Sequence, residues 1–438
     1  MQPYLSPLAV WALSVGTAIG WGSLVVTGNT YLSQAGPLGS ILGLLIGFGM
    51  MLVVANHYHF LANHYPGTGG LYNYVKYIFG YDRAFLVAWF LFLIYTAIFW
   101  ANATSITLFA RYFLGGIFRL GHLYNIFGYE VYLGQAIVTL AVITLVSLLC
   151  IHSKKATSRS VAVLTIVFTI GITVCFIGAM IGHGASGAAI EPVFAPDGSA
   201  FRQVVRIAFL SPWAFIGFES ISHSAGEYNF KHSRMFRVLL IALIVITALY
   251  IFVILLSVSA YPEGCTSWFD YISRLDEFDG IEGLPAFYAA DHYLGSFGVV
   301  TLMASLLALV LTSLIGTLRA VSRLCYAVAQ DGVLPEYFSG LNKKQIPVKT
   351  ILLVVFLSLH IPFLGMSAIG WIVDTTTIGA TIIYGFAIAA VFKVSLKEKK
   401  KKDIAISGSV CLYWSHFPYI CFSLNSFRII RLKRKSMY

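Results

Sequence analysis

The stretch Gly16-Thr17-Ala18-Ile19-Gly20-Trp21-Gly22-Ser23 interrupts an apolar run near the start of the chain. No Asp, Glu, Lys or Arg precedes Lys76, so the stretch lies within a hydrophobic segment rather than in a charged loop. Its three glycines weaken a helix at this point, because each costs about 1 kcal/mol relative to Ala in a helix interior. The sequence therefore predicts a membrane helix that is broken at mid-membrane depth.

A second stretch, Ser211-Pro212-Trp213-Ala214-Phe215-Ile216-Gly217-Phe218-Glu219, breaks a later apolar run. Pro212 lacks a backbone N–H and crowds the preceding turn. Gly217 then relaxes the backbone just before a carboxylate. A charged side chain within a membrane helix is costly, by about 2.5 kcal/mol or more, so we expect Glu219 to face the protein interior.

The composition places the chain in a membrane. Of its 438 residues, 58% are hydrophobic and 11% are charged, and the mean hydropathy is +0.81. Charged residues make up roughly a quarter of an average soluble domain, so a water-soluble enzyme is excluded. The apolar runs are long enough to cross a bilayer as helices and lack the alternation of an outer-membrane barrel. We expect an all-α polytopic membrane protein with about eleven transmembrane helices. The expected spans are residues 8–31, 36–58, 84–110, 131–153, 160–190, 207–226, 238–262, 292–318, 348–364, 367–392 and 404–427.

The charges of the loops predict the orientation. With a cytoplasmic N-terminus, most Lys and Arg residues fall on the inner side, whereas the outer loop Tyr261–Phe297 holds seven acids and one base. This asymmetry follows the positive-inside rule. Topology thus explains the formal net charge of +11, and we expect no nucleic-acid partner. The expected location is the cell membrane, specifically a bacterial inner membrane.

The spans form two sets of five, at about residues 8–183 and 203–392. Because five is odd, the second set starts from the opposite side of the membrane and has inverted topology, a common construction of secondary transporters. Residues 1–395 are expected to form this core. Residues 396–438 add a basic linker, an atypical last hydrophobic segment and a basic tail. That last segment either lies at the inner interface or marks a truncated or frameshifted end.

Two matched breaks favour one central binding site. Freed backbone groups survive at membrane depth only where protein or a polar cavity satisfies them. Helix N-termini then offer positive ends to an anion, and unwound carbonyls face a cation, which suits a zwitterion such as an amino acid. The alternative is that glycines only let helices pack closely, as we expect for Gly39, Gly43 and Gly47.

The quoted residues resemble the amino acid–polyamine–organocation (APC) transporter family. Residues 16–23 are similar to the broken first helix of that family, Pro66–Tyr74 to the loop after its second helix, and residues 213–220 to its sixth helix. Residues 322–335 resemble the end of its eighth helix. The resemblance covers about residues 8–395. It implies a five-plus-five inverted-repeat fold whose first and sixth helices are broken.

The resemblance also implies roles for the residues of both breaks. Backbone N–H groups of the first break would bind a substrate carboxylate, and the carbonyls of Trp213, Phe215 and Ile216 would bind an α-ammonium group. Trp213 or Phe215 would act as an aromatic gate. The candidate substrate-binding residues in the breaks are Ile19, Gly20, Trp21, Gly22, Ser23, Trp213, Ala214, Phe215, Ile216 and Gly217.

Polar residues of the third span extend this candidate site. Tyr95 and Asn102 lie seven residues apart, hence on one helical face. They would either line the substrate pocket or form hydrogen bonds between helices. The sequence leaves both interpretations open.

Several residues are candidates for coupling or gating. Glu219 would either take a coupling proton or organise the broken backbone by accepting hydrogen bonds. His223 follows four residues later, on the same face of an α-helix, and we expect it at the cytoplasmic end. Thr312-Ser313 lies near the position where sodium-coupled relatives supply hydroxyl ligands, although such hydroxyls usually bond back to a carbonyl one turn earlier. Some proton-coupled members of the family use a lysine in the fifth helix, and Val161–Ile181 contains none.

The sequence thus predicts a secondary transporter that carries amino acids by alternating access around the two breaks. One alternative is a carrier of polyamines or organic cations, and another is a membrane sensor that binds amino acids without transporting them. We expect no enzymatic activity, no metal site and no cofactor, with a proton or a sodium ion as the coupling ion. The expected partners are an amino acid or amine substrate and the lipid bilayer.

Overall fold

The computed structural model describes residues 3–114, 116–126, 129–186, 190–196 and 198–399. The last hydrophobic segment predicted from the sequence, residues 404–427, lies outside the described residues.

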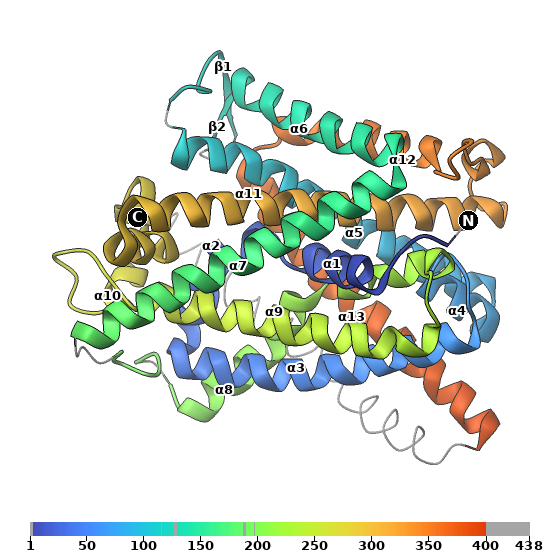
Figure 1. The fold of residues 1–438 in the computed structure, drawn as a ribbon, viewed down its shortest axis with the longest axis horizontal. Coiled ribbons are helices and arrows are strands. Elements are labelled where there is room, and N and C mark those ends of the chain that lie inside the picture. The colour runs from blue at the N-terminus through green and yellow to red at the C-terminus, as the bar shows by residue number, and fades with distance from the viewer. Residues whose placement is uncertain (1–2, 115, 127–128, 187–189, 197, 400–438) are drawn as a thin grey trace.

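Most of the described chain is α-helical (Figure 1). The α-helices are α1 (Pro7–Ala18), α2 (Trp21–Val26), α3 (Ser33–His64), α4 (Leu71–Phe79), α5 (Tyr81–Phe113), α6 (Leu133–His152), α7 (Lys154–Ser186), α8 (Ala200–Leu210), α9 (Met235–Val258), α10 (Trp268–Ser273), α11 (Pro285–Gln330), α12 (Val348–Ser358) and α13 (Gly365–Glu398). A π-helical segment, η1 (Thr27–Leu32), joins α2 to α3. The 3₁₀ helices are η2 (Ser211–Phe215), η3 (Phe218–Glu227), η4 (His232–Arg234), η5 (Leu275–Glu277), η6 (Gly280–Gly283), η7 (Glu336–Ser339) and η8 (Ile361–Phe363).

Eight of these helical segments are long and apolar enough to cross a membrane. They are Thr30–His64, Tyr81–Phe113, Leu133–His152, Lys154–Gly184, Ala200–Glu227, His232–Val258, Pro285–Gln330 and Ile378–Glu398, and two shorter apolar helices are Pro7–Ala18 and Val348–Phe363. Each span that the sequence predicts within the described residues overlaps at least one of these segments, and residues 8–31 overlap Pro7–Ala18 at their start and Thr30–His64 at their end. The predicted class, an all-α polytopic membrane protein, is confirmed.

Two regions between the spans differ from the prediction. Between α5 and α6 lies a small antiparallel hairpin of β1 (His122–Ile126) and β2 (Tyr129–Tyr132), which the sequence analysis missed. These strands are rich in Tyr, Val and Ile, which favour extended backbone. The expected loop 261–297 contains α10, and α11 already begins at Pro285 and bends at Gly295, where φ is 58°.

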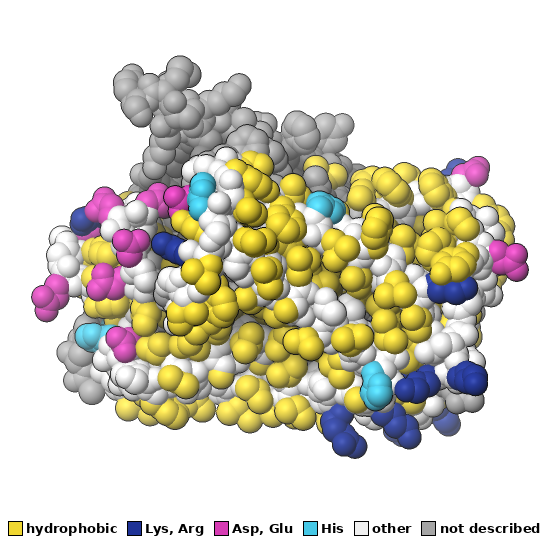
Figure 2. Space-filling view, turned by 90° about the horizontal axis from the view of Figure 1, so that it is seen from above, with side chains coloured by type: hydrophobic (Ala, Val, Ile, Leu, Met, Phe, Trp, Pro, Cys, Tyr) yellow, Lys and Arg dark blue, Asp and Glu magenta, His cyan; other side chains and the backbone are white. Residues whose placement is uncertain are grey.

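Charged side chains separate along the long axis of the molecule. Figure 2 shows hydrophobic side chains over the middle of one face, with Lys and Arg gathered toward one end and Asp and Glu toward the other. Exposed hydrophobic side chains of the described helices include Leu145, Ile170 and Phe356. Such exposure suits contact with lipid tails, so the surface agrees with a membrane protein.

Glycines of α3 let it pack closely against α8. A Cβ atom added to Gly43 would lie 2.5 Å from Ile207 Cβ, and one added to Gly47 would overlap Ser211 Oγ. Because Gly43 and Gly47 have no Cβ atom, α3 can lie next to the start of the second break, as small residues allow between membrane helices. Close packing by Gly43 and Gly47 matches the expectation from their four-residue spacing. It does not weaken the case for the two breaks, which lie elsewhere.

Gly47→Ala should lower the stability of the protein by roughly 1–3 kcal/mol, because the added methyl group collides with Ser211. Gly49 of the same helix offers the matched control, since a Cβ there meets no atom within 4 Å. Gly49→Ala should leave stability unchanged or raise it by up to about 1 kcal/mol. Thermal unfolding of the purified protein in detergent measures the difference, and equal effects of both substitutions would contradict this packing.

Candidate functional site

The first break lies between α1 and α2. Helix α1 ends at Ala18, and Ile19 adopts an extended backbone conformation with φ −93° and ψ 118°. The Trp21 N–H donates to Asn102 Oδ1 at 3.1 Å, and Ser23 Oγ donates to the Gly20 carbonyl at 2.8 Å. Side chains thus satisfy backbone groups that the break releases.

Asn102 of α5 connects this break to α11. Its Nδ2 donates to Ser313 Oγ at 3.0 Å, and Ser313 Oγ donates to the Thr17 carbonyl at 3.4 Å. A Cβ atom on Gly20 would lie 2.6 Å from Asn102 Oδ1, so only glycine lets the amide approach this closely. Asn102 therefore forms hydrogen bonds between helices, while its contact with a substrate stays a prediction.

The second break lies between η2 and η3. Ile216 has a non-helical ψ of 128°, and Gly217 adopts the left-handed conformation with φ 106°. A Cβ atom on Gly217 would lie 2.9 Å from the Thr17 carbonyl oxygen. Ser14 Oγ of α1 also donates to the Phe218 carbonyl at 2.9 Å. The two broken segments therefore touch each other, at the C-terminal end of α1.

Glu219 accepts hydrogen bonds from three parts of the structure. Its Oε2 accepts from the Gly217 N–H and from the Tyr384 hydroxyl, each at 3.0 Å, and its Oε1 accepts from the Tyr95 hydroxyl at 3.1 Å. The residue is fully buried. Hydrogen bonds to an ionised acceptor are stronger than those between neutral groups, so these three donors suit a buried carboxylate. The carboxylate links the second break to α5 and α13.

Most of the predicted site residues are buried. The buried ones are Ile19, Trp21, Ser23, Tyr95, Asn102, Ala214, Phe215, Ile216, Gly217, Glu219, Thr312 and Ser313, whereas Gly20, Gly22 and Trp213 are partly exposed. The contacts join Trp21, Asn102 and Ser313 into one group, and Gly217, Glu219 and Tyr95 into another. The Trp213 carbonyl accepts from the Ile216 N–H at 3.3 Å, so a ligand ammonium group would share it with this bond.

The threonines near the first break bond within the protein. Thr312 Oγ1 donates to the Leu309 carbonyl at 2.9 Å, the backward bond expected for a hydroxyl in a membrane helix. Thr165 Oγ1 of α7 donates to the Ala12 carbonyl at 3.2 Å. A Cβ atom on Gly16 would lie 2.7 Å from Thr312 Cβ and 3.2 Å from Thr165 Oγ1, so Gly16 lets both helices approach α1.

His223 is fully buried. The prediction that it shares a helical face with Glu219 is wrong. Because η3 is a 3₁₀ helix with about three residues per turn, Glu219 and His223 do not share a face as they would in an α-helix. They are connected instead through Tyr95, whose ring lies edge-on to the imidazole at 5.4 Å between centroids.

Sequence reasoning missed Tyr384. This tyrosine of α13 supplies one of the three donors to Glu219. A tyrosine in an apolar span has no distinctive pattern, and only the packing of α13 against α5 and α3 brings it to the carboxylate. The one signal in the sequence is Glu219 itself, because a buried carboxylate needs hydrogen-bond donors and a tyrosine hydroxyl of another span can supply one.

Comparisons with known proteins show which family and which transporters the chain is similar to. A family model described as amino acid permease matches residues 5–428. The chain is similar to the methylthioribose transporter of Bacillus subtilis, with 23% identity over 421 residues that cover 94% of this chain and 87% of that protein. It is similar to the vacuolar cationic amino acid transporter 4 of Arabidopsis thaliana, with 27% identity over 92% of this chain and 65% of that protein, just under two thirds of its length. It is also similar to an arginine/ornithine antiporter of Pseudomonas aeruginosa, with 24% identity over 92% of this chain and 83% of that protein.

Gly217→Ala should destabilise the protein by more than Gly264→Ala. Both glycines have positive φ, 106° and 94°, so both substitutions impose backbone strain of about 1–2 kcal/mol. Only at Gly217 does the added Cβ atom also collide with the Thr17 carbonyl, whereas Gly264 has open space around it. Thermal unfolding in detergent compares the two variants, and an equal loss would contradict the close contact of the two breaks.

Proposed function

The chain belongs to the amino acid permease family, and on this premise we propose that it transports amino acids across the membrane as a secondary transporter. The observation that carries the proposal is the contact between two broken helices, where Gly217 lies against the Thr17 carbonyl deep in the protein. The Pseudomonas and Arabidopsis relatives are a transporter of arginine and ornithine and a transporter of cationic amino acids. We extend their substrate class, amino acids, to this chain.

The proposed site binds the two charged ends of an amino acid through backbone groups. Backbone N–H groups of Ile19–Ser23 would take the carboxylate, and the carbonyls of Trp213, Phe215 and Ile216 would take the ammonium group. The N–H groups of Ile19, Trp21 and Ser23 donate to Val15, Asn102 and Gly20 in this structure, so they would have to exchange these bonds for the ligand. Ala214 and Gly217 complete this lining. Tyr95 and Asn102 would position the site through their bonds to Glu219 and to Trp21.

We place gating and coupling at the same centre. Trp213 is partly exposed and Phe215 is fully buried beside the second break, so these rings would separate the substrate from one side of the membrane. Either Glu219 would take a coupling proton, or Thr312 and Ser313 would offer hydroxyl oxygens to a coupling sodium ion. Alternating access then means that the site opens in turn to each side of the membrane.

The proposed orientation has a cytoplasmic N-terminus in a cell membrane, in particular a bacterial inner membrane. The backbone N–H groups of Tyr4 and Leu5 donate to the Glu227 carbonyl, and the Tyr4 side chain lies close to Lys154 and Arg319. The N-terminal segment therefore lies among basic side chains, which the positive-inside rule places in the cytoplasm. The proposed unit of transport is the core of residues 1–395 with its two inverted halves, 8–183 and 203–392.

Counterflow in proteoliposomes tests the proposed function. Vesicles are preloaded with one unlabelled compound at a time, and uptake of the labelled compound is followed without an ion gradient. The panel holds arginine, ornithine, neutral amino acids, a polyamine and methylthioribose. Accumulation with one or more amino acids is the expected result. Accumulation with the polyamine alone would replace the proposal by an organic-cation carrier, and binding without counterflow would replace it by a sensor.

Glu219→Gln should lower counterflow about tenfold or more. The substituted amide keeps one acceptor oxygen and turns an NH₂ group toward donors, so at least one charge-assisted hydrogen bond of the second break is lost. Glu277→Gln is the matched control, because Glu277 is an exposed carboxylate paired with Arg274. Full counterflow in Glu219→Gln would contradict its organising role, and if proton-driven uptake were then lost, only the coupling role would remain.

A further inference from the structure

A second buried cluster of charge lies at the basic end of the molecule. The side chain of Glu227, the last residue of η3, is fully buried. Arg323 donates through Nε to its Oε2 at 2.9 Å and through Nη2 to its Oε1 at 3.1 Å. Arg319 Nη2 donates to Oε2 at 3.3 Å, and Lys154 Nζ lies 3.5 Å from Oε1. In the part of the chain that the structure describes, these three cations share this one carboxylate, and we call the four residues the Glu227 cluster.

The N-terminal segment closes over the Glu227 cluster. The Tyr4 and Leu5 N–H groups donate to the Glu227 carbonyl at 2.8 and 2.9 Å, and Arg319 Nη2 donates to the Tyr4 hydroxyl at 2.7 Å. Burial raises the pKa of the Tyr4 hydroxyl, so it stays neutral at physiological pH and adds no negative charge. The cluster therefore keeps an excess of positive charge, which is costly in a buried environment.

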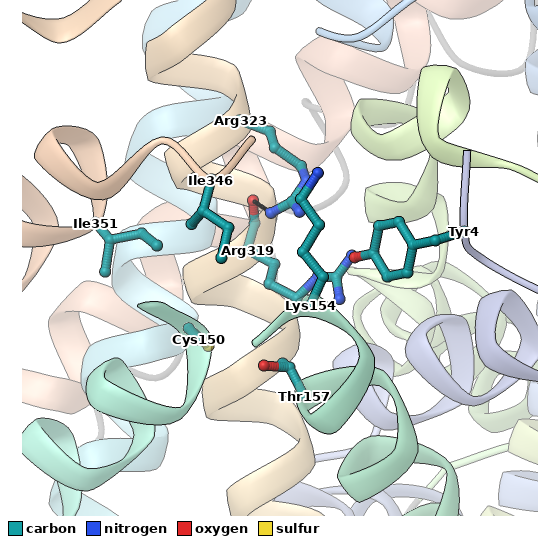
Figure 3. A pocket seen from close by; sticks show the side chains of 8 residues that line it. All are labelled: Tyr4, Cys150, Lys154, Thr157, Arg319, Arg323, Ile346 and Ile351. Carbon is teal, nitrogen blue, oxygen red and sulfur yellow. Dashed lines mark hydrogen bonds between the residues drawn. The ribbon is translucent and has the colours of Figure 1, made fainter. Parts of the chain in front are cut away.

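A small cavity lies against these cations (Figure 3). It is lined by Tyr4, Cys150, Lys154, Thr157, Arg319, Arg323, Ile346 and Ile351. Figure 3 shows the Arg319 and Lys154 side chains meeting in its middle, with Tyr4 on one side and Ile346 and Ile351 on the other. The space admits a group of about the size of one water molecule.

Arg319 carries a donor that the protein does not use. The residue is 4% exposed, and its Nε has no hydrogen-bond partner. An unpaired buried donor on a charged group is costly, by about 1–3 kcal/mol or more. An acceptor in the cavity would remove this cost, and a negatively charged acceptor would also offset the excess positive charge.

We propose that this cavity binds a halide-sized inorganic anion, such as chloride, between Arg319 and Lys154. The cations and the unused N–H group define the sign of the ligand, and the small volume between Ile346, Ile351 and Cys150 limits its size. Larger oxyanions and lipid headgroups do not fit this space. The site is separate from the proposed substrate site at the two breaks and does not depend on the proposed transport function.

The bound anion would join four parts of the chain. The N-terminal segment, η3, α7 and α11 each supply a residue to the Glu227 cluster or to the cavity. An anion that neutralises their charge stabilises the arrangement in which these parts meet. A ligand that binds the folded protein and not the unfolded chain shifts the folding equilibrium toward the folded protein.

Thermal unfolding of the full-length protein in detergent tests the site. Sodium chloride replaces sodium gluconate stepwise at constant ionic strength, and bromide and sulfate are compared at millimolar concentration. Chloride and bromide should raise the apparent Tm by roughly 3 °C with saturation, and gluconate and sulfate should not. A Tm that is independent of chloride, or that rises equally with sulfate, would overturn the proposal.

Substitutions locate the effect. Lys154→Gln and Arg319→Gln should each abolish most of the chloride-dependent rise in Tm, because each removes a positive charge from the cavity. Arg237→Gln is the control, since Arg237 is an exposed arginine at the start of α9 and should leave the rise intact. An equal rise in all three variants would place the anion elsewhere and refute the site. Should neither cavity variant fold, the anion series on the unsubstituted protein still decides between binding and its absence.

Discussion

The Glu219 carboxylate holds the second break together, and the central site depends on it. A helix that breaks within a membrane exposes backbone groups that lipid cannot satisfy. Here the carboxylate accepts the Gly217 N–H at the point where the backbone turns into the left-handed region, and the hydroxyls of Tyr95 and Tyr384 fix it from two other helices. The break is therefore a defined structure rather than a loosened helix. Its geometry follows from one buried carboxyl group and three donors.

At the first break, the neutral side chain of Asn102 plays the part that the Glu219 carboxyl group plays at the second. Asn102 accepts from the Trp21 N–H and donates to Ser313, which in turn donates to the Thr17 carbonyl. Gly20 and Gly217 allow these close approaches because neither carries a Cβ atom. Thr17 contacts the second break and also belongs to this chain of hydrogen bonds. A movement of α5 or α11 would consequently disturb both breaks, which suits a site that has to respond as a unit.

Much of the architecture could be predicted because hydrophobic runs and helix-breaking residues act locally. Pro212 and Gly217 mark the second break in sequence, and polar residues such as Tyr95 and Asn102 stand out against an apolar span. Sequence could not show that η3 is a 3₁₀ helix, which removes His223 from the face of Glu219. It also could not pair Glu227 with arginines 92 and 96 residues later, because such pairing depends on how η3 packs against α11. Tyr384 was missed for the same reason.

The central claim is that an amino acid binds between the two breaks, and a structure of the protein determined with its transported amino acid bound tests this most directly. The account predicts that the carboxylate lies against the backbone N–H groups of Ile19–Ser23 and that the ammonium group lies against the carbonyls of Trp213, Phe215 and Ile216. It also predicts that the Glu219 hydrogen bonds are retained. A substrate found elsewhere, with both breaks unchanged and packed as they are here, would contradict the account.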